Sequence, residues 1–239
     1  MTGAVACSVA PEVFRRFPEY VRGLVLAHGV RNGPSSPALA ALLREAEASV
    51  RARIRPEAVN DHPRLASWRA AYKALGINPK DFRCSVEAMA RRALKDQQLP
   101  AINALVDIGN ILSLRHLVPM GSHAIDTARE DYRLRPATGA ERFIPFGTDQ
   151  EEHPEPGEII FAEGDEVLTR RWSWRQSNHT LTLPGTTAVE FNVDGLPPVG
   201  AAEVAAICAE LAELVVSHCG GRVRIELLTA ERPSVSMAD

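Results

Sequence analysis

The stretch Leu99–Asp126, LPAINALVDIGNILSLRHLVPMGSHAID, decides how the rest of this chain is interpreted. Its first part, Ala101–His116, is predicted to be a helix, because Pro100 precedes it and Pro119 lies just beyond its end. Its second part is less apolar, and polar residues cluster after Pro119. The stretch therefore joins a helix to a candidate functional segment.

Three polar residues of the predicted helix, Asn103, Asp107 and Asn110, are spaced so that they share one face. Most other positions of this helix are apolar, and a carboxylate buried there without partners is costly. Two interpretations are open. The polar line either forms a structural network that caps neighbouring loops or contributes to a functional site.

His123 and Asp126 follow a Pro-Met-Gly-Ser turn. Histidine changes its protonation near neutral pH, and an aspartate nearby can orient its ring. The pair is a candidate for acid–base chemistry, and a surface or core contact is the alternative.

The chain is predicted to be helical in its first half and rich in strands in its second half. Helices are predicted at residues 38–53, 61–75, 85–95, 101–116 and 200–218. Strands are predicted at residues 23–28, 142–146, 158–162, 167–174, 180–183, 188–193 and 222–228. This order indicates an α+β fold.

The composition excludes several classes of protein. Of 239 residues 45% are hydrophobic, yet no apolar run approaches the roughly 18 residues of a membrane span. The N-terminus has no basic region ahead of its short apolar stretch, so we expect no signal peptide and a cytoplasmic location without a membrane partner. The four cysteines show no zinc-ligand spacing, and no phosphate-binding or nucleophile motif is present, so we expect no metal and no cofactor.

The charge balance says little about partners. The net charge is −3, and the basic residues are 24 Arg against 3 Lys. Arginine is the better phosphate ligand, but codon bias in a GC-rich genome explains the same imbalance. Three arginines, Arg91, Arg92 and Arg171, lie in short basic pairs and are candidates for phosphate contacts.

Several short motifs occur in a fixed order between Trp68 and Asn192. Val106-Asp107, Asn110, Pro119 and His123-Ala124-Ile125-Asp126 resemble the pattern VD-x-x-N … P … HA-(aromatic)-D, and residues 135–143 resemble R-x-A-x-x-G-E-x-F/L. In this order the motifs resemble the B3/B4 module, the editing region of the phenylalanyl-tRNA synthetase β subunit. That module recognises a mischarged aminoacyl-tRNA and helps to hydrolyse its ester.

The resemblance implies a fold and a domain division. We expect a β-sandwich-like sheet core of the B3/B4 type, flanked by helices. The chain has no room for a synthetase around it, so we expect a free-standing B3/B4 protein. The expected division is an N-terminal strand and helix extension at 1–60, the B3/B4-like domain at 61–229 and a flexible tail at 230–239.

The resemblance also implies roles for individual residues. His123 and Asp107 would position water or the ribose hydroxyls, and Asn110 would hold the local backbone. The amino-acid pocket would be formed by Gly121, Ser122, Glu141, Trp174, Arg175 and Gln176. Phosphates of the tRNA would contact Arg91, Arg92 and Arg171.

The run Trp172-Ser173-Trp174-Arg175-Gln176 lies where the synthetase module has a Gly-Gly-Glu turn, whose acid reads the hydroxyl of tyrosine. Free-standing members share the W-x-W-R-Q run. A pocket that selects by hydrogen bonds discriminates steeply, so this replacement predicts a substrate other than tyrosine.

Three functions are therefore compared. The first is a trans-editing deacylase in translation quality control, a hydrolase that cleaves the ester of a mischarged tRNA. The second is a non-catalytic protein of the same fold that binds tRNA or an amino acid. The third is an esterase or amidase for small molecules that uses an Asp–His pair.

Overall fold

The apolar run Val21–His28 forms strand β2, an inner strand of a four-stranded antiparallel sheet. The order of this sheet is β3-β8-β2-β9, with β3 at Met120–Ala124, β8 at Ala188–Gly195 and β9 at Arg222–Leu228. In the computed structural model, which describes residues 5–239, seven of the eight residues of β2 are buried. Both faces of the strand are therefore covered.

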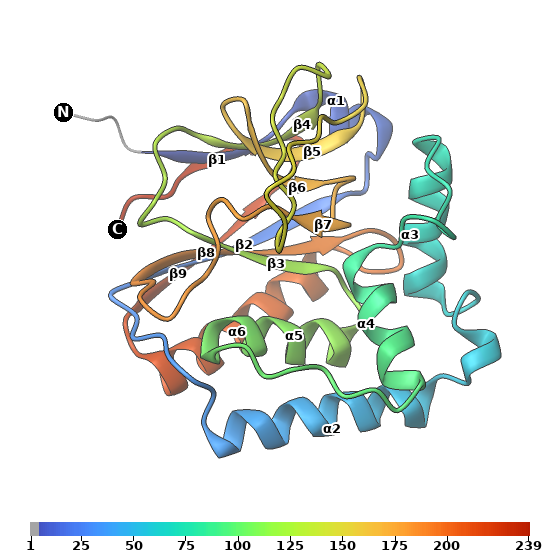
Figure 1. Cartoon of the computed structure of the whole chain (residues 1–239), viewed down its shortest axis with the longest axis vertical. Coiled ribbons are helices and arrows are strands. Elements are labelled where there is room, and N and C mark those ends of the chain that lie inside the picture. The colour runs from blue at the N-terminus through green and yellow to red at the C-terminus, as the bar shows by residue number, and fades with distance from the viewer. Residues whose placement is uncertain (1–4) are drawn as a thin grey trace.

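A six-stranded sheet covers one face of the four-stranded sheet (Figure 1). Its order is β10-β1-β4-β5-β6-β7, and only the β1–β4 pair is parallel. The strands are β1 at Ala6–Val9, β4 at Tyr132–Pro136, β5 at Ile159–Glu163, β6 at Glu166–Arg170, β7 at Arg175–Gln176 and β10 at Ser234–Ser236.

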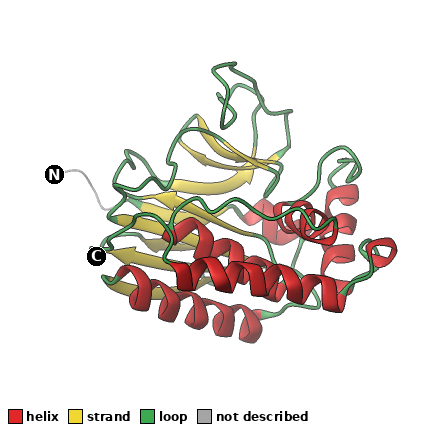
Figure 2. Cartoon of the chain, turned by 60° about the horizontal axis from the view of Figure 1, so that its bottom comes forward, coloured by secondary structure: helices red, strands yellow, loops and turns green. Residues whose placement is uncertain are grey.

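Most of the helices lie on the opposite side of the four-stranded sheet (Figure 2), whereas the short helix at Pro11–Arg16 packs against β4 of the six-stranded sheet. The helices are α1 at Pro11–Arg16, α2 at Pro37–Arg53, α3 at Pro63–Ala74, α4 at Ser85–Leu94, α5 at Ala104–His116 and α6 at Ala201–Cys219, with a 3-10 turn at Pro56–Ala58. Helix α6 packs closely on β2, since a Cβ at Gly23 would lie 2.4 Å from Cys208 Sγ. None of these helices is long and apolar enough to cross a membrane. The α+β class predicted from the sequence is confirmed.

Local signals place two helix starts. The Ser36 hydroxyl accepts a hydrogen bond from the Leu39 amide at the start of α2, and Pro37 occupies the first helical position. At α5 the helix begins at Ala104 and not at Ala101, because the Asn103 side chain accepts from the Val106 amide and caps the helix. Similarly, α3 begins at Pro63 after His62, two residues later than predicted.

Two predicted strands are absent from the described part of the chain. Residues 142–146 make only isolated bridges, because Pro145 has no amide hydrogen for a regular ladder. Residues 180–183 form a loop, since Thr180 adopts a left-handed conformation (φ 56°) that interrupts an extended run.

The segments that begin at residue 5 and end at residue 239 are part of the folded unit. The predicted flexible tail instead contains β10, which pairs with β1, and Met237 is 1% exposed. The predicted N-terminal extension supplies β1, the inner strand β2 and helix α2. Residues 5–60 therefore pack in the same core as the rest of the chain, because the apolar faces of these strands have no other cover.

Candidate functional site

A line of polar residues lies between the two sheets. Glu190, Asn192 and Asp194 alternate with apolar residues along β8, so they share the face opposite to Phe191, whose ring contacts helix α5. All three are buried, with exposed fractions of 0%, 6% and 0%. A strand was predicted at residues 188–193 but this polar line was not, although the alternation E-x-N-x-D is visible in the sequence.

Arg22 of β2 holds this line together. Its Nη1 donates to Asp194 Oδ1 at 3.1 Å, and its guanidinium lies 4.3 Å from the centre of the Phe161 ring. Asp194 also accepts hydrogen bonds from the Tyr20 hydroxyl and from Asn192 Nδ2. A buried charge needs such partners, and Arg22 and Asp194 supply them to each other.

Of the two acids in this line, Glu190 has fewer hydrogen-bond partners than Asp194. Its Oε1 lies 3.6 Å from Arg22 Nη2, and neither carboxylate oxygen has a hydrogen-bond partner among the described residues. Burial, reinforced by the charge of Asp194 and opposed by that of Arg22, raises the pKa of Glu190 to about 7. This carboxyl group is therefore part protonated at neutral pH.

His123 lies on β3 directly opposite Glu190 in the strand register. Its Nδ1 is 3.0 Å from Thr180 Oγ1, and its Nε2 is 3.4 Å from Thr169 Oγ1. Burial, together with the positive charges of Arg22 and His179, lowers the pKa of His123 to about 3. The ring is therefore neutral at pH 7, and it positions neighbouring groups better than it takes up a proton.

Two cavities meet beside His123. The smaller, about 100 Å³, is lined by Arg22, Ser85, His123, Trp172, Trp174 and Asn192 among others. The larger, about 410 Å³, is lined by Asn103, Asn110, Ser122, Phe146, Thr182 and Phe191 among others. Both cavities are lined by Met120, Gly121, Arg175 and Gln176. These four residues therefore form the junction between the two spaces.

Close packing at the junction requires a glycine at residue 121. A Cβ there would lie 2.8 Å from Asn192 Oδ1, so a larger side chain would displace the Asn192 amide. Gln176 Nε2 donates to the Ser122 carbonyl at 3.1 Å, which fixes the Gln176 side chain across the junction. Arg175 Nη2 donates weakly to the Phe146 carbonyl at 3.4 Å, and Arg175 pairs with no carboxylate in the described residues.

The larger cavity has an apolar rim. Ile102, Phe146 and Leu183 are 55%, 61% and 56% exposed, which is unusual for large apolar side chains, and all three line this cavity. Its polar wall is rigid, because Thr182 donates to Ser122 Oγ and its carbonyl accepts from Asn103 Nδ2. A flat, partly apolar ligand with polar edges fits such a surface.

The structure therefore brings together most of the predicted pocket residues. His123, Gly121, Trp174, Arg175 and Gln176 line the smaller cavity. Of the other predicted residues, Ser122 and Asn110 line the larger one. Sequence reasoning missed Arg22, Glu190, Asn192 and Asp194.

Asp107 and Glu141 lie elsewhere. Asp107 is fully buried and accepts hydrogen bonds from the Ser35 hydroxyl and the Ile102 amide, so it ties two loops to the start of α5. Glu141 pairs with Arg135 and accepts from the Thr138 amide. Burial alone would raise the pKa of Glu141, but these hydrogen bonds outweigh it and lower the pKa to about 2. Neither residue lines the two joined cavities.

The three predicted phosphate ligands have different surroundings. Arg91 Nε donates to Glu87 at 2.8 Å, and the Arg171 guanidinium lies 3.7 Å from the centre of the Phe82 ring. Arg92 is exposed and donates only to the Gln98 carbonyl. Arg92 therefore has the most accessible charge of the three.

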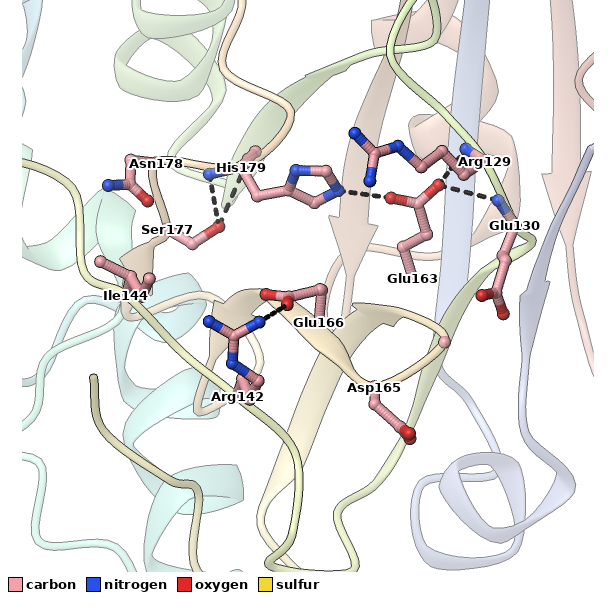
Figure 3. Close-up of a pocket in the computed structure, with 11 residues that line it drawn as sticks. Arg129, Glu130, Arg142, Ile144, Glu163, Asp165, Glu166, Ser177, Asn178 and His179 are labelled. Atoms are coloured by element: carbon pink, nitrogen blue, oxygen red, sulfur yellow. Dashed lines mark hydrogen bonds and ion pairs between the residues drawn. The ribbon is translucent and has the colours of Figure 1, made fainter. Parts of the chain in front are cut away.

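A further cavity of about 540 Å³ is lined in part by Ser177, Asn178 and His179, which belong to the loop at residues 177–182 (Figure 3). In it the His179 ring contacts the Glu163 carboxylate, which also accepts from the Arg129 and Glu130 amides. The next residue along the loop, Thr180, contacts His123. The His179–Glu163 pair therefore anchors the loop that supports His123. Among residues 5–239 no group of His, Cys, Asp and Glu side chains is arranged to hold a metal ion.

The fold and motifs place the chain in a family. A family model for the B3/4 domain matches residues 67–220, and the chain belongs to that family. This confirms the resemblance drawn from the motifs. An N-terminal fragment of the phenylalanyl-tRNA synthetase β-subunit from Pyrococcus horikoshii is a structural neighbour, with 11% identity and a TM-score of 0.48. The match covers 92% of this chain and 50% of that fragment, so this chain spans about half of its length. No curated protein matches the chain.

Proposed function

We propose that this protein binds the aminoacyl-adenosine end of a mischarged tRNA and hydrolyses its ester. The observation that carries the proposal is a pair of neighbouring cavities whose linings share Gly121 and Gln176. The larger cavity suits the terminal adenosine, because Phe146 on its rim offers a surface on which a base can stack. The smaller cavity then receives the amino-acid side chain, and the ester lies at the junction.

The chemistry needs no protein nucleophile. A water oxygen attacks the ester carbonyl, the bond from that carbon to the ribose oxygen breaks, and the ribose oxygen leaves with a proton. Negative charge develops on the carbonyl oxygen, and donors held beside it stabilise the transition state. We assign that role to Arg175 and Gln176, which line both cavities.

Neutral His123 and Asn110 act by position. His123 orients water or the aminoacyl group through its ring nitrogens, and Asn110 contacts the ribose hydroxyls from the wall of the larger cavity. Because the pKa of His123 is low, the proton of the attacking water passes to the leaving ribose oxygen, relayed by the vicinal hydroxyl of the substrate or by a second water. The match to the B3/4 domain, together with the resemblance of the motifs to the synthetase editing module, supports tRNA as the carrier.

A second candidate function is binding without hydrolysis. The observation that favours it is the same low pKa of His123, because a ring that resists protonation near pH 7 is a weak general base. On this reading the protein would hold aminoacyl-tRNA in the same cavities and release it unchanged.

A deacylation assay separates the two functions. The full chain is incubated with a panel of labelled mischarged tRNAs, alongside Gln176→Ala, Arg175→Ala and the control Ser217→Ala, which changes an exposed serine of α6. We expect Gln176→Ala and Arg175→Ala to slow release of the amino acid by about 100-fold, the usual effect of removing one oxyanion donor. His123→Ala should also slow it, and Ser217→Ala should leave it unchanged.

Tight tRNA binding with no turnover of any member of the panel would support the binder instead. Turnover that is equal in the wild type and in both junction variants would contradict the assignment of the junction as the site. Activity on small esters without tRNA would favour the third function.

A further inference from the structure

The smaller cavity has little room. Its volume of about 100 Å³ equals that of roughly three water molecules in the liquid. An apolar cavity of about 150 Å³ takes up benzene, so a cavity of about 100 Å³ is smaller than a phenyl ring needs, whereas a carboxymethyl group has only four heavy atoms. Phe161, Trp172 and Trp174 form rigid aromatic walls, so the cavity does not widen easily. If an aminoacyl side chain enters here, it is short.

The same cavity is rich in hydrogen-bond donors. Ser85 Oγ, Arg22 Nε and Trp172 Nε1 are buried without a hydrogen-bond partner among the described residues, and all three side chains line the cavity. Arginine and indole nitrogens can only donate, and a serine hydroxyl can donate. Buried donors of this kind are normally paired. A ligand that offers hydrogen-bond acceptors would pair with these donors.

The electrostatic field favours the same ligand. Ser85 is the first residue of α4, a helix of ten residues with no side-chain cap, so the positive end of its dipole faces the cavity. Neither Asp nor Glu occurs among the described residues that line the cavity. Asp194 balances much of the charge of Arg22, so a neutral amide is accepted as well as a carboxylate.

We infer that the smaller cavity is a side-chain subsite for a short aminoacyl group that ends in a carbonyl acceptor, the chemistry shared by aspartyl and asparaginyl groups. This rests on the proposed function, in which the side chain enters this cavity. Size excludes phenylalanyl and tyrosyl groups, and the unpaired donors disfavour an aliphatic group, which would leave them unsatisfied.

The test measures binding and turnover separately. Non-hydrolysable 3′-amide analogues of aminoacyl-adenosine, carrying aspartyl, asparaginyl, alanyl or phenylalanyl groups, are titrated into the full chain by calorimetry. The corresponding aminoacyl-tRNAs are followed for release of the amino acid. We expect the aspartyl or asparaginyl analogue to bind at least ten-fold more tightly than the alanyl and phenylalanyl analogues. Comparing the aspartyl analogue with the asparaginyl analogue shows whether the cavity prefers a carboxylate or a neutral amide.

Ser85→Ala is the informative variant, because it removes one unpaired donor and leaves the Ser85 amide bonded to the Ser173 carbonyl. It should weaken aspartyl and asparaginyl binding about ten-fold and leave alanyl binding unchanged. Ser217→Ala is the matched control.

The outcomes distinguish this inference from the proposed function. Selective binding without turnover sustains the subsite and overturns hydrolysis. Hydrolysis that prefers phenylalanyl-tRNA, or an unchanged preference in Ser85→Ala, overturns the subsite and leaves hydrolysis standing. Binding of no analogue at all overturns both.

Discussion

Glu190 illustrates how far an environment changes a side chain. A glutamate in an unfolded chain has a pKa of about 4.3, whereas burial raises the pKa of Glu190 to about 7 in the folded protein. The folded state therefore holds this proton more tightly than the unfolded state does. The contribution of Glu190 to the free energy of unfolding therefore falls as the pH rises from about 4 to about 7, and it stays level at higher pH.

This gives a prediction at the residue scale. Glu190→Gln keeps the shape and removes the charge, so we expect it to gain stability relative to the wild type at pH 8 and to differ little at pH 5. Arg22 has a raised pKa and His123 a pKa of about 3, so neither changes its charge between pH 5 and pH 8. Urea denaturation at the two pH values measures the difference.

Glu45→Gln, an exposed change on α2, is the control and should show no such pH dependence. A difference between Glu190→Gln and the wild type that is equal at pH 5 and pH 8 would show that Glu190 keeps its charge when buried.

At the scale of elements, helix α5 and the loop at residues 177–182 hold the site in place. Asp107 connects the start of α5 to Ser35 and Ile102. In the loop, His179 lines the cavity of about 540 Å³, and Thr182 lines the one of about 410 Å³. Thr180, between them, contacts His123 of the smallest cavity. The sequence analysis left two interpretations for Asp107, and its hydrogen bonds favour the structural one.

Asp107→Ala separates these interpretations. The change leaves the Ile102 amide and the Ser35 hydroxyl without their acceptor, so we expect the free energy of unfolding to fall by about 1–3 kcal/mol. Deacylation by the protein that remains folded should be unchanged. Denaturation and single-turnover assays at low temperature measure the two effects, and lost turnover with intact stability would make Asp107 a functional residue.

At the scale of the whole molecule, a net charge of −3 gives no general attraction to tRNA. Binding must then depend on a few local cations, and Arg92 is the most accessible of the three predicted from the sequence. Arg91 is less available, because Glu87 pairs with it and with Arg69.

We therefore expect Arg92→Ala to weaken tRNA binding uniformly and to reduce the slope of log affinity against log salt by about one. Arg222→Ala, a 74% exposed position on β9, is the control and should not change the slope. Filter binding across a series of salt concentrations measures both. An unchanged slope in Arg92→Ala would remove Arg92 from the tRNA surface.

Much of the fold was accessible from the sequence because its signals are local. Helices α2, α4, α5 and α6 lie within a few residues of their predicted ranges, since apolar periodicity and flanking proline act over short distances. Motif order also indicated the family and placed His123 and Gln176 at one pocket. The prediction of a strand at residues 142–146 was wrong, because Pro145 prevents a regular ladder of backbone hydrogen bonds there.

The sequence by itself determined most of the helices, the α+β class, the family and some of the polar residues near the candidate site, such as His123 and Gln176. Only the tertiary structure decided which polar residues face inward. Alternation along β8 divides Glu190, Asn192 and Asp194 from Val189, Phe191 and Val193, but it does not say that the polar face is buried as well as the apolar one. That choice depends on Arg22, far away in the chain, because a buried carboxylate is stable only where the fold brings a partner to it.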